Sequence, residues 1–160
     1  MRFPGGASPT ACTGNAKSLA EGGRLAGGAK LAGHSVNLSR LEDALDVLAM
    51  LNRPDAAILA DVYHTYRGGS SFASYRRLSA ALLPILHVND YPATPPREKL
   101  VDADRVWPGD GIAPWKEIFD CLDAVGADPW LSIELFNPAY WRTTPADTLR
   151  TGISRVKSLR

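Results

Sequence analysis

Three polar side chains stand at the carboxyl ends of three short apolar runs: Asp61, His87 and Glu134. A carboxylate or imidazole is a poor occupant of a buried strand, because an unpaired buried charge costs several kcal/mol or is forced to neutralise. A divalent cation bound by all three side chains would remove that cost. Two carboxylates and one imidazole suit Mn²⁺, Mg²⁺ or Co²⁺, with Zn²⁺ as a further candidate, and we expect Mn²⁺.

Each of these residues also has a simpler interpretation. A single Asp or Glu at a strand end often caps a helix or anchors a loop, and a single His is no better evidence for a metal. The three together, on consecutive strands and at the same end, favour a metal site. The pattern therefore predicts that the three side chains converge.

Predicted strands and helices alternate around these residues. Apolar runs indicate buried parallel strands at 56–62, 85–89 and 130–135. Helical spacing predicts helices at 40–51, from Ser70 or Ser71 to about 82, at 114–126 and from Thr144 to about 156. Ser39 and Glu42 have capping-box spacing before the first helix. A long loop with several prolines covers 91–111.

This order of elements predicts right-handed βαβ units on a parallel sheet. Periodicity alone fits both a barrel and an open doubly wound sheet. Residues 1–33 contain repeated glycine pairs and few large apolar side chains, so we expect an irregular segment there and one domain over 34–160. A closed (β/α)8 barrel needs about 250 residues, which is more than this chain of 160 supplies.

Composition narrows the range of partners. The formal net charge is +1 and the basic residues form no run or stripe, so a nucleic-acid partner is not expected. The sequence has no apolar run near the roughly 20 residues of a membrane helix, and we expect no membrane partner. Cys12 and Cys121 lie far apart, and the sequence shows no apolar h-region of a secretory signal, so we expect a reduced, cytoplasmic setting.

Four segments carry the polar residues of interest: Ala60-Asp61-Val62-Tyr63-His64, His87-Val88-Asn89-Asp90, Arg105-Val106-Trp107-Pro108-Gly109-Asp110-Gly111 and Leu131-Ser132-Ile133-Glu134-Leu135. In order and spacing they resemble the sugar phosphate isomerase/epimerase family of xylose isomerase-like TIM barrels. The resemblance covers about residues 36–159 and implies a partial (β/α)8 barrel, its C-terminal half. It implies that Asp61, His87 and Glu134 are metal ligands and that Glu134 is also catalytic.

The resemblance further implies that His64 and Arg105 bind substrate oxygens. Without the family, His64 would be interpreted as a capping or surface residue and Arg105 as a solvated loop cation. Asn89 and Asp90 either orient the His87 ring or cap the loop that follows. Three aromatic residues either wall a sugar pocket or pack its rim: Trp107, Phe136 and Trp141.

The activity implied by the resemblance is the metal-dependent movement of a proton on a ketose sugar or its phosphate, through an enediolate. The expected partner is a small-molecule sugar, and a homo-oligomer is compatible with the family. One family feature is missing, because a further Glu is expected on the strand before Arg40 and residues 24–31 contain no acid. The alternative is therefore a catalytically impaired or non-catalytic fragment of such a barrel.

A third possible function, phosphodiester hydrolysis, is disfavoured by the number of histidines. AP endonucleases share this barrel but use a multi-zinc site. The sequence contains only His34, His64 and His87, and no basic surface for DNA is evident.

Overall fold

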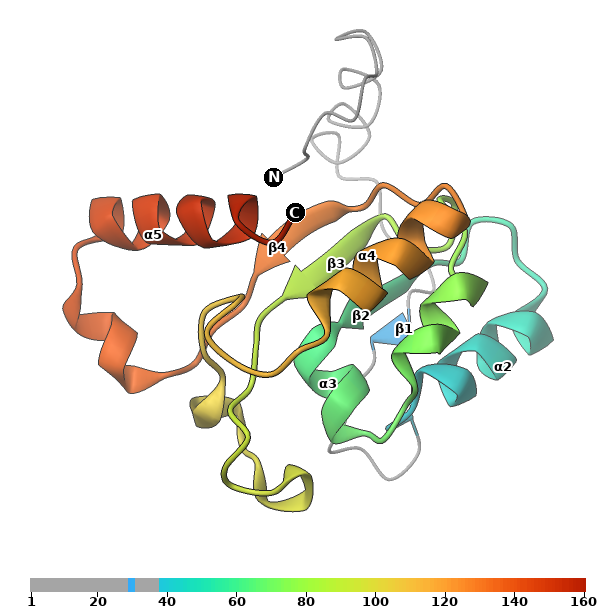
Figure 1. Cartoon of the computed structure of the whole chain (residues 1–160). Coiled ribbons are helices and arrows are strands. Elements are labelled where there is room, and N and C mark those ends of the chain that lie inside the picture. Colours follow the sequence, from blue (N-terminus) through green and yellow to red (C-terminus); the bar gives the residue numbers. More distant parts are fainter. Residues whose placement is uncertain (1–28, 31–37) are drawn as a thin grey trace, which may run out of the picture.

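The computed structural model describes residues 29–30 and 38–160 and contains a sheet of four parallel strands (Figure 1). The strands are β1 (Ala29–Lys30), β2 (Ile58–Asp61), β3 (Ile85–Val88) and β4 (Trp130–Ile133), in the spatial order β1-β2-β3-β4. The three predicted strands are confirmed, each to within two residues. β1 was not predicted, because it lies in the segment 1–33 that was expected to be irregular. The rest of that segment lies outside the described residues.

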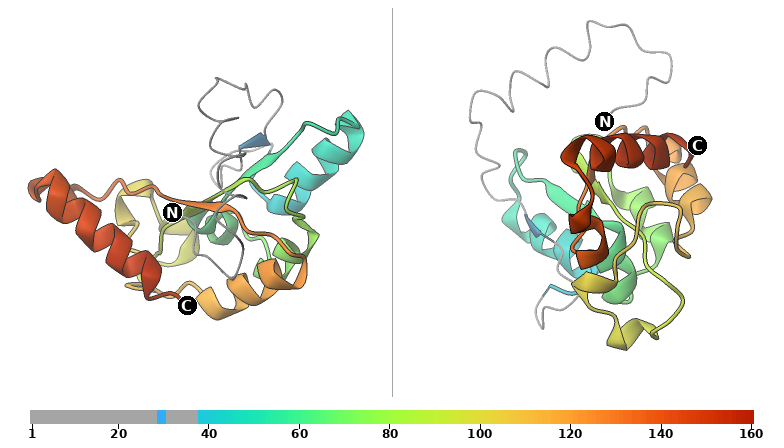
Figure 2. Two further views of the ribbon diagram at one scale, coloured as in Figure 1. Left: turned by 90° about the horizontal axis from the view of Figure 1, so that it is seen from above. Right: turned by 90° about the vertical axis from the view of Figure 1, so that its left-hand side faces the viewer.

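Four α-helices accompany the sheet in the described part of the chain: α2 (Leu41–Leu51), α3 (Val62–Arg67), α4 (Trp115–Ala124) and α5 (Pro145–Lys157). Helices α2 and α4 lie on the same face of the sheet, whereas α5 lies beyond the β4 edge (Figures 1 and 2). The apolar stripes of α2 and α4 are buried in one core with the strands. The longest of these helices, α5, has 13 residues, and no helix of this part of the chain could cross a bilayer.

The N-terminus of α2 is held by a distant segment rather than by the predicted capping box. Arg40 is the N-cap residue, and its side chain makes no capping hydrogen bond. The backbone N–H of Leu41 donates to Ser70 Oγ at 2.8 Å, and the Glu42 carboxylate accepts a hydrogen bond from the Ser74 hydroxyl. The capping-box prediction is therefore wrong, because tertiary packing supplies serines that take over its role.

The chain after β2 also differs from the prediction. Helix α3 begins at once, because the Asp61 side chain accepts a hydrogen bond from the His64 N–H and caps it. The helix predicted from Ser70 or Ser71 to about 82 is only a 3₁₀ turn, η1 (Phe72–Arg77). Beyond it, the Leu82 carbonyl accepts a 2.7 Å hydrogen bond from Ile58 N at the start of β2. This hydrogen bond joins the segment before β3 to the sheet, and the helix does not continue to Leu82.

The register of the strands determines which side chains share a face. Asp61 pairs with His87, and His87 pairs with Ser132. Side chains alternate along a strand, and Leu86 and Val88 are fully buried toward the helices. The opposite face therefore carries Asp61 and His87, at the carboxyl ends of their strands. This is the edge at which parallel α/β folds place their sites.

Asp90 anchors the long loop between β3 and α4. Its side chain is fully buried and accepts hydrogen bonds of 2.8–3.0 Å from four donors: the backbone N–H groups of Tyr91, Gly109 and Ala113 and the indole Nε1 of Trp115. The loop packs tightly here, since a Cβ at Gly111 would lie 2.3 Å from Asp90 Oδ1. Of the two roles considered for Asp90, the structure supports the loop anchor.

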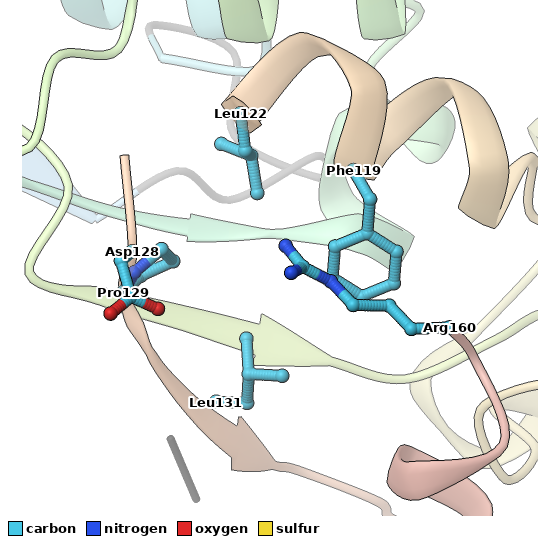
Figure 3. A pocket seen from close by; sticks show the side chains of 6 residues that line it. All are labelled: Phe119, Leu122, Asp128, Pro129, Leu131 and Arg160. Carbon is cyan, nitrogen blue, oxygen red and sulfur yellow. The ribbon is translucent and has the colours of Figure 1, made fainter. Parts of the chain in front are cut away.

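The C-terminal segment packs back onto the sheet. Helix α5 starts as predicted, with Thr144 accepting a hydrogen bond from Asp147 N and Pro145 in the first turn. At its other end the Arg160 side chain lies beside the Phe119 ring (Figure 3), with the guanidinium carbon 4.6 Å from the ring centre. The same guanidinium pairs with Asp123 at 2.9 Å. Between α5 and β4 lies a mainly apolar groove of about 410 Å³.

Candidate metal and substrate site

The three side chains predicted to converge do so. One possible ligand atom from each of Asp61, His87 and Glu134 lies within 4.8 Å of the others. The His87 Nδ1 atom is 3.4 Å from Asp61 Oδ2 and 3.3 Å from Glu134 Oε2. These spacings allow one cation to contact all three residues.

Strand pairing explains this convergence. Asp61 and His87 are lateral partners on β2 and β3. Glu134 follows directly after β4, two residues beyond Ser132, which is the partner of His87. Because side chains alternate along a strand, Glu134 returns to the face occupied by His87. The sequence pattern could indicate this arrangement because the period of a strand is two residues.

Asp61 uses its two carboxylate oxygens for different contacts. Oδ1 accepts the capping hydrogen bond from His64 N at 3.0 Å, and Oδ2 faces His87. The residue is only 1% exposed. Burial by itself would raise the pKa of Asp61, but the contact with His87 and the charge of Arg105 outweigh it and hold the pKa below its ordinary value. Asp61 is therefore both a helix cap and a member of the cluster.

Asn89 supports Asp61 rather than His87. Its Nδ2 group donates to Asp61 Oδ2 at 3.1 Å, and its Oδ1 atom accepts from Tyr63 N at 2.8 Å. The same Nδ2 group lies 3.4 Å from the carbonyl oxygen of Glu134. Asn89 is fully buried. The hydrogen bonds of Asn89 therefore support a role in holding Asp61 and do not support a role in orienting the His87 ring.

Arg105 lies at the centre of the cluster. Its Nη1 atom is 2.9 Å from Glu134 Oε2 and 3.3 Å from Asp61 Oδ2, so one nitrogen bridges both carboxylates. The residue is 1% exposed, which excludes a solvated loop cation. Burial would lower the pKa of Arg105, but the charges of Asp61, Asp102 and Glu134 raise it, so the guanidinium stays charged.

His64 is bound to the same guanidinium. Arg105 Nη2 lies 2.9 Å from His64 Nε2. A guanidinium has no acceptor, so Nε2 must accept this hydrogen bond and the neutral His64 ring carries its proton on Nδ1. The Tyr63 ring lies 4.5 Å below the guanidinium carbon, and burial is the main cause that raises the pKa of Tyr63 to about 12.

Asp102 is a member of the cluster that the sequence analysis missed. It lies in the 3₁₀ turn η3 (Asp102–Asp104), and its Oδ1 atom accepts a 2.5 Å hydrogen bond from Arg105 Nη2. The only sequence signal is the spacing of three residues between an acid and a base. That spacing is common on surface turns, so it did not distinguish Asp102 from its neighbours.

The three aromatic residues considered for a sugar pocket have different environments. Phe136 lies 5.1 Å from the Arg105 guanidinium carbon, which places it beside the cluster. Trp107 is buried against Tyr140, with ring centres 5.1 Å apart, and also lines the groove between β4 and α5. Trp141 is 70% exposed. Phe136 is thus the one of the three with a described contact to the site.

The donor set fits a divalent cation. His87 Nδ1 is buried and makes no hydrogen bond with any described residue, although it faces two carboxylates. The carboxylates of Asp61, Glu134 and Asp102 carry three formal negative charges against one positive charge on Arg105. With neutral imidazoles the cluster has a formal charge of −2, which one divalent cation would balance. Oxygen and imidazole ligands suit Mn²⁺ and Zn²⁺ alike.

A parallel α/β sheet with such a cluster at the carboxyl ends of its strands is typical of the α/β proteins, barrels among them, that keep their sites at this face. The chain belongs to the xylose isomerase-like TIM barrel family, whose model matches residues 29–159. The fold is accordingly a partial (β/α)8 barrel. This confirms the family and the barrel expected from the four sequence segments.

Particular relatives make the comparison more specific. The chain is 29% identical over 114 residues to the inosose isomerases of Bacillus velezensis and Bacillus subtilis, covering 71% of this chain and 40% and 41% of theirs. The crystal structure of the IolI protein with a bound zinc atom is similar with a TM-score of 0.76 and 25% identity, covering 81% of this chain and 47% of that one. The chain therefore spans less than half the length of these relatives.

Proposed function

We propose that the chain provides the metal-binding face of a sugar isomerase or epimerase that moves a proton on a ketose such as an inosose. The observation that carries this proposal is the convergence of Asp61, His87 and Glu134 on one point at the carboxyl edge of the sheet. The names of the relatives support the substrate class, since an inosose is a cyclic polyhydroxy ketone. A small-molecule sugar is therefore the proposed partner.

The proposed metal ligands are Asp61, His87 and Glu134. When bound there, a divalent cation would supply positive charge beside the substrate's carbonyl and adjacent hydroxyl, which acidifies the intervening C–H. The proposal retains Mn²⁺ as the ion, and the zinc-bound IolI structure makes Zn²⁺ the first ion to test against it. No described residue discriminates between the two by geometry.

Glu134 is the proposed catalytic base. Its side chain is 25% exposed, the highest value among the three ligands, so substrate can approach it. Its carboxylate would take the proton from the carbon that bears the hydroxyl, and the enediolate that results would be reprotonated at the neighbouring carbon or on the other face. One oxygen of a carboxylate can contact a cation while the other accepts a proton.

His64 and Arg105 are the proposed substrate-binding residues. The Nε group of Arg105 is buried and makes no hydrogen bond with the described residues, so one N–H of the guanidinium is unsatisfied beside the cluster. His64 has Nε2 bonded to Arg105 and is only 6% exposed, which fixes its ring beside the cluster. Donors of this kind stabilise negative charge that develops on the substrate.

A second candidate is a barrel fragment that binds metal but does not turn over sugar. Three ligands come from the described residues, and β1, the strand beside β2, consists of Ala29 and Lys30 without an acid. Epimerisation through a single carboxylate is slow, because one group must remove the proton and return it on the other face. The proposed cytoplasmic location, supported by the free thiol of Cys121, is common to both candidates.

The decisive experiment is deuterium exchange at the substrate carbon. The chain is incubated with Mn²⁺ or Zn²⁺ and an inosose in D₂O, and loss of the α-proton signal is followed by NMR. The proposal expects metal-dependent exchange that Glu134→Gln abolishes and Glu98→Gln, on the loop between β3 and α4, leaves unchanged. Metal binding without exchange would instead identify the fragment, and absence of metal binding would refute both candidates.

A further inference from the structure

The Arg105 guanidinium shares its hydrogen bonds between two groups of carboxylates. Nη1 contacts Asp61 and Glu134, the proposed metal ligands, at 3.3 and 2.9 Å. Nη2 contacts Asp102 Oδ1 at 2.5 Å. A cation bound by Asp61 and Glu134 would therefore compete with Nη1 for the same two oxygens. Asp102 is not a proposed metal ligand, so its carboxylate can stay bound to the guanidinium when a cation is present.

Asp102 is well placed to neutralise the buried guanidinium of Arg105, because its own carboxylate remains in contact with water. Its side chain is 48% exposed, whereas the Arg105 side chain is 1% exposed. The carboxylate thus remains partly hydrated while it neutralises a guanidinium that has left water almost completely, and neutralisation of a buried charge requires such a partner. Without Asp102, the charge of the guanidinium would be neutralised by Asp61 and Glu134 alone among its described contacts.

We propose that Asp102 is a positioning residue, which holds the Arg105 guanidinium so that Asp61 and Glu134 are free to bind a divalent cation. This inference rests on the proposed function, because it assumes metal binding by Asp61, His87 and Glu134. Asp102 touches neither the proposed ligands nor the reacting atoms in any described contact and acts only through Arg105. Its effect should accordingly appear in the affinity for metal, before any substrate is added.

Asp104 provides a matched control. It lies in the same 3₁₀ turn and carries the same charge, but its carboxylate accepts a hydrogen bond from Val101 N at 2.8 Å instead of binding Arg105. Neutralisation of either residue removes one negative charge from the same turn. Only neutralisation of Asp102 removes a hydrogen bond to the guanidinium.

The test is the dissociation constant for Mn²⁺, measured by electron paramagnetic resonance of the free ion without substrate. We expect Asp102→Asn to weaken Mn²⁺ binding by about tenfold, Asp104→Asn by less than about twofold, and Asp102→Glu to restore affinity to within about threefold of the unaltered protein. Equal losses in Asp102→Asn and Asp104→Asn would overturn the inference and leave the proposed function intact. Absence of Mn²⁺ binding by the unaltered protein would overturn both.

A double-mutant cycle separates positioning from general loop damage. If Asp102 acts through Arg105, Asp102→Asn should weaken Mn²⁺ binding by less than about twofold once Arg105→Gln is present. Arg105→Lys serves the same purpose if Arg105→Gln does not fold, because one ammonium group cannot reproduce the two-sided fork of the guanidinium. A full tenfold loss from Asp102→Asn in either Arg105 background would contradict the inference.

Discussion

Asp61 and His87 are lateral partners on β2 and β3, and this pairing places His87 Nδ1 3.4 Å from Asp61 Oδ2. The nitrogen is buried and has no hydrogen bond among the described residues, although it faces the carboxylates of Asp61 and Glu134. An imidazole that faces two carboxylates is well suited to be a metal ligand.

Replacement of His87 by Gln should weaken Mn²⁺ or Zn²⁺ binding by at least about 100-fold, because the one imidazole among the three proposed ligands is lost. Stability without metal should change by less than about 1 kcal/mol, because Nδ1 makes no hydrogen bond with the described residues and the main loss is its contact with Asp61. Isothermal titration calorimetry and urea unfolding measure the two effects. Ser132→Ala, which alters the β4 partner of His87, is the control and should leave affinity unchanged.

A carboxylate at position 30 is expected to raise metal affinity. Lys30 ends β1 and is paired with Leu59, two residues before Asp61 on the neighbouring strand. Lys30→Glu removes a positive charge and adds a carboxylate on the strand where the family resemblance places a further ligand. We expect Mn²⁺ affinity to rise by about tenfold or more. Lys99→Glu makes the same charge change in the turn η2 (Arg97–Lys99), and an equal gain from it would show that only the net charge matters.

Asp90→Asn should destabilise the loop that leads to Arg105. The carboxylate accepts four hydrogen bonds, and an amide can accept them only on its oxygen, so the donors that face its nitrogen lose their partner. The expected cost is about 2–4 kcal/mol in the free energy of unfolding. Urea unfolding followed by tryptophan fluorescence measures it. Asp110→Asn, which removes the exposed ion pair with Arg155, should cost less than about 0.5 kcal/mol.

The Glu42 carboxylate predicts a pH dependence of stability. Burial alone would raise the pKa of Glu42, but hydrogen bonds from Ser74 and Ser70 and the charge of Arg40 lower it below the ordinary value. A group with a depressed folded pKa stabilises the fold above its unfolded pKa of about 4.3, and this contribution is lost as the pH falls through the folded pKa. Glu42→Gln should therefore reduce stability at pH 7 by about 0.5–1 kcal/mol. The difference should shrink as the pH falls through the folded pKa of Glu42, and a pH-independent difference would contradict this prediction.

The sequence by itself determined the strands and the chemistry at their ends. The strands β2, β3 and β4 were predictable because a buried parallel strand is a short, continuous apolar run. Asp61, His87 and Glu134 were identifiable because strands of a parallel sheet finish at one edge and alternate their faces with a period of two. Both properties are local, so they can be read without knowledge of the partners.

Only the tertiary structure decided the contacts that join distant segments. The serines that bind the start of α2 lie about thirty residues away from it, at Ser70 and Ser74. Asp61 proved to be a helix cap as well as a candidate ligand. Arg105, which without the family resemblance would be interpreted as a solvated loop cation, lies at the buried centre of the site beside Asp102. Such pairs have no period in the sequence, because they depend on how loops fold over the sheet edge and which charges must be neutralised once water is excluded.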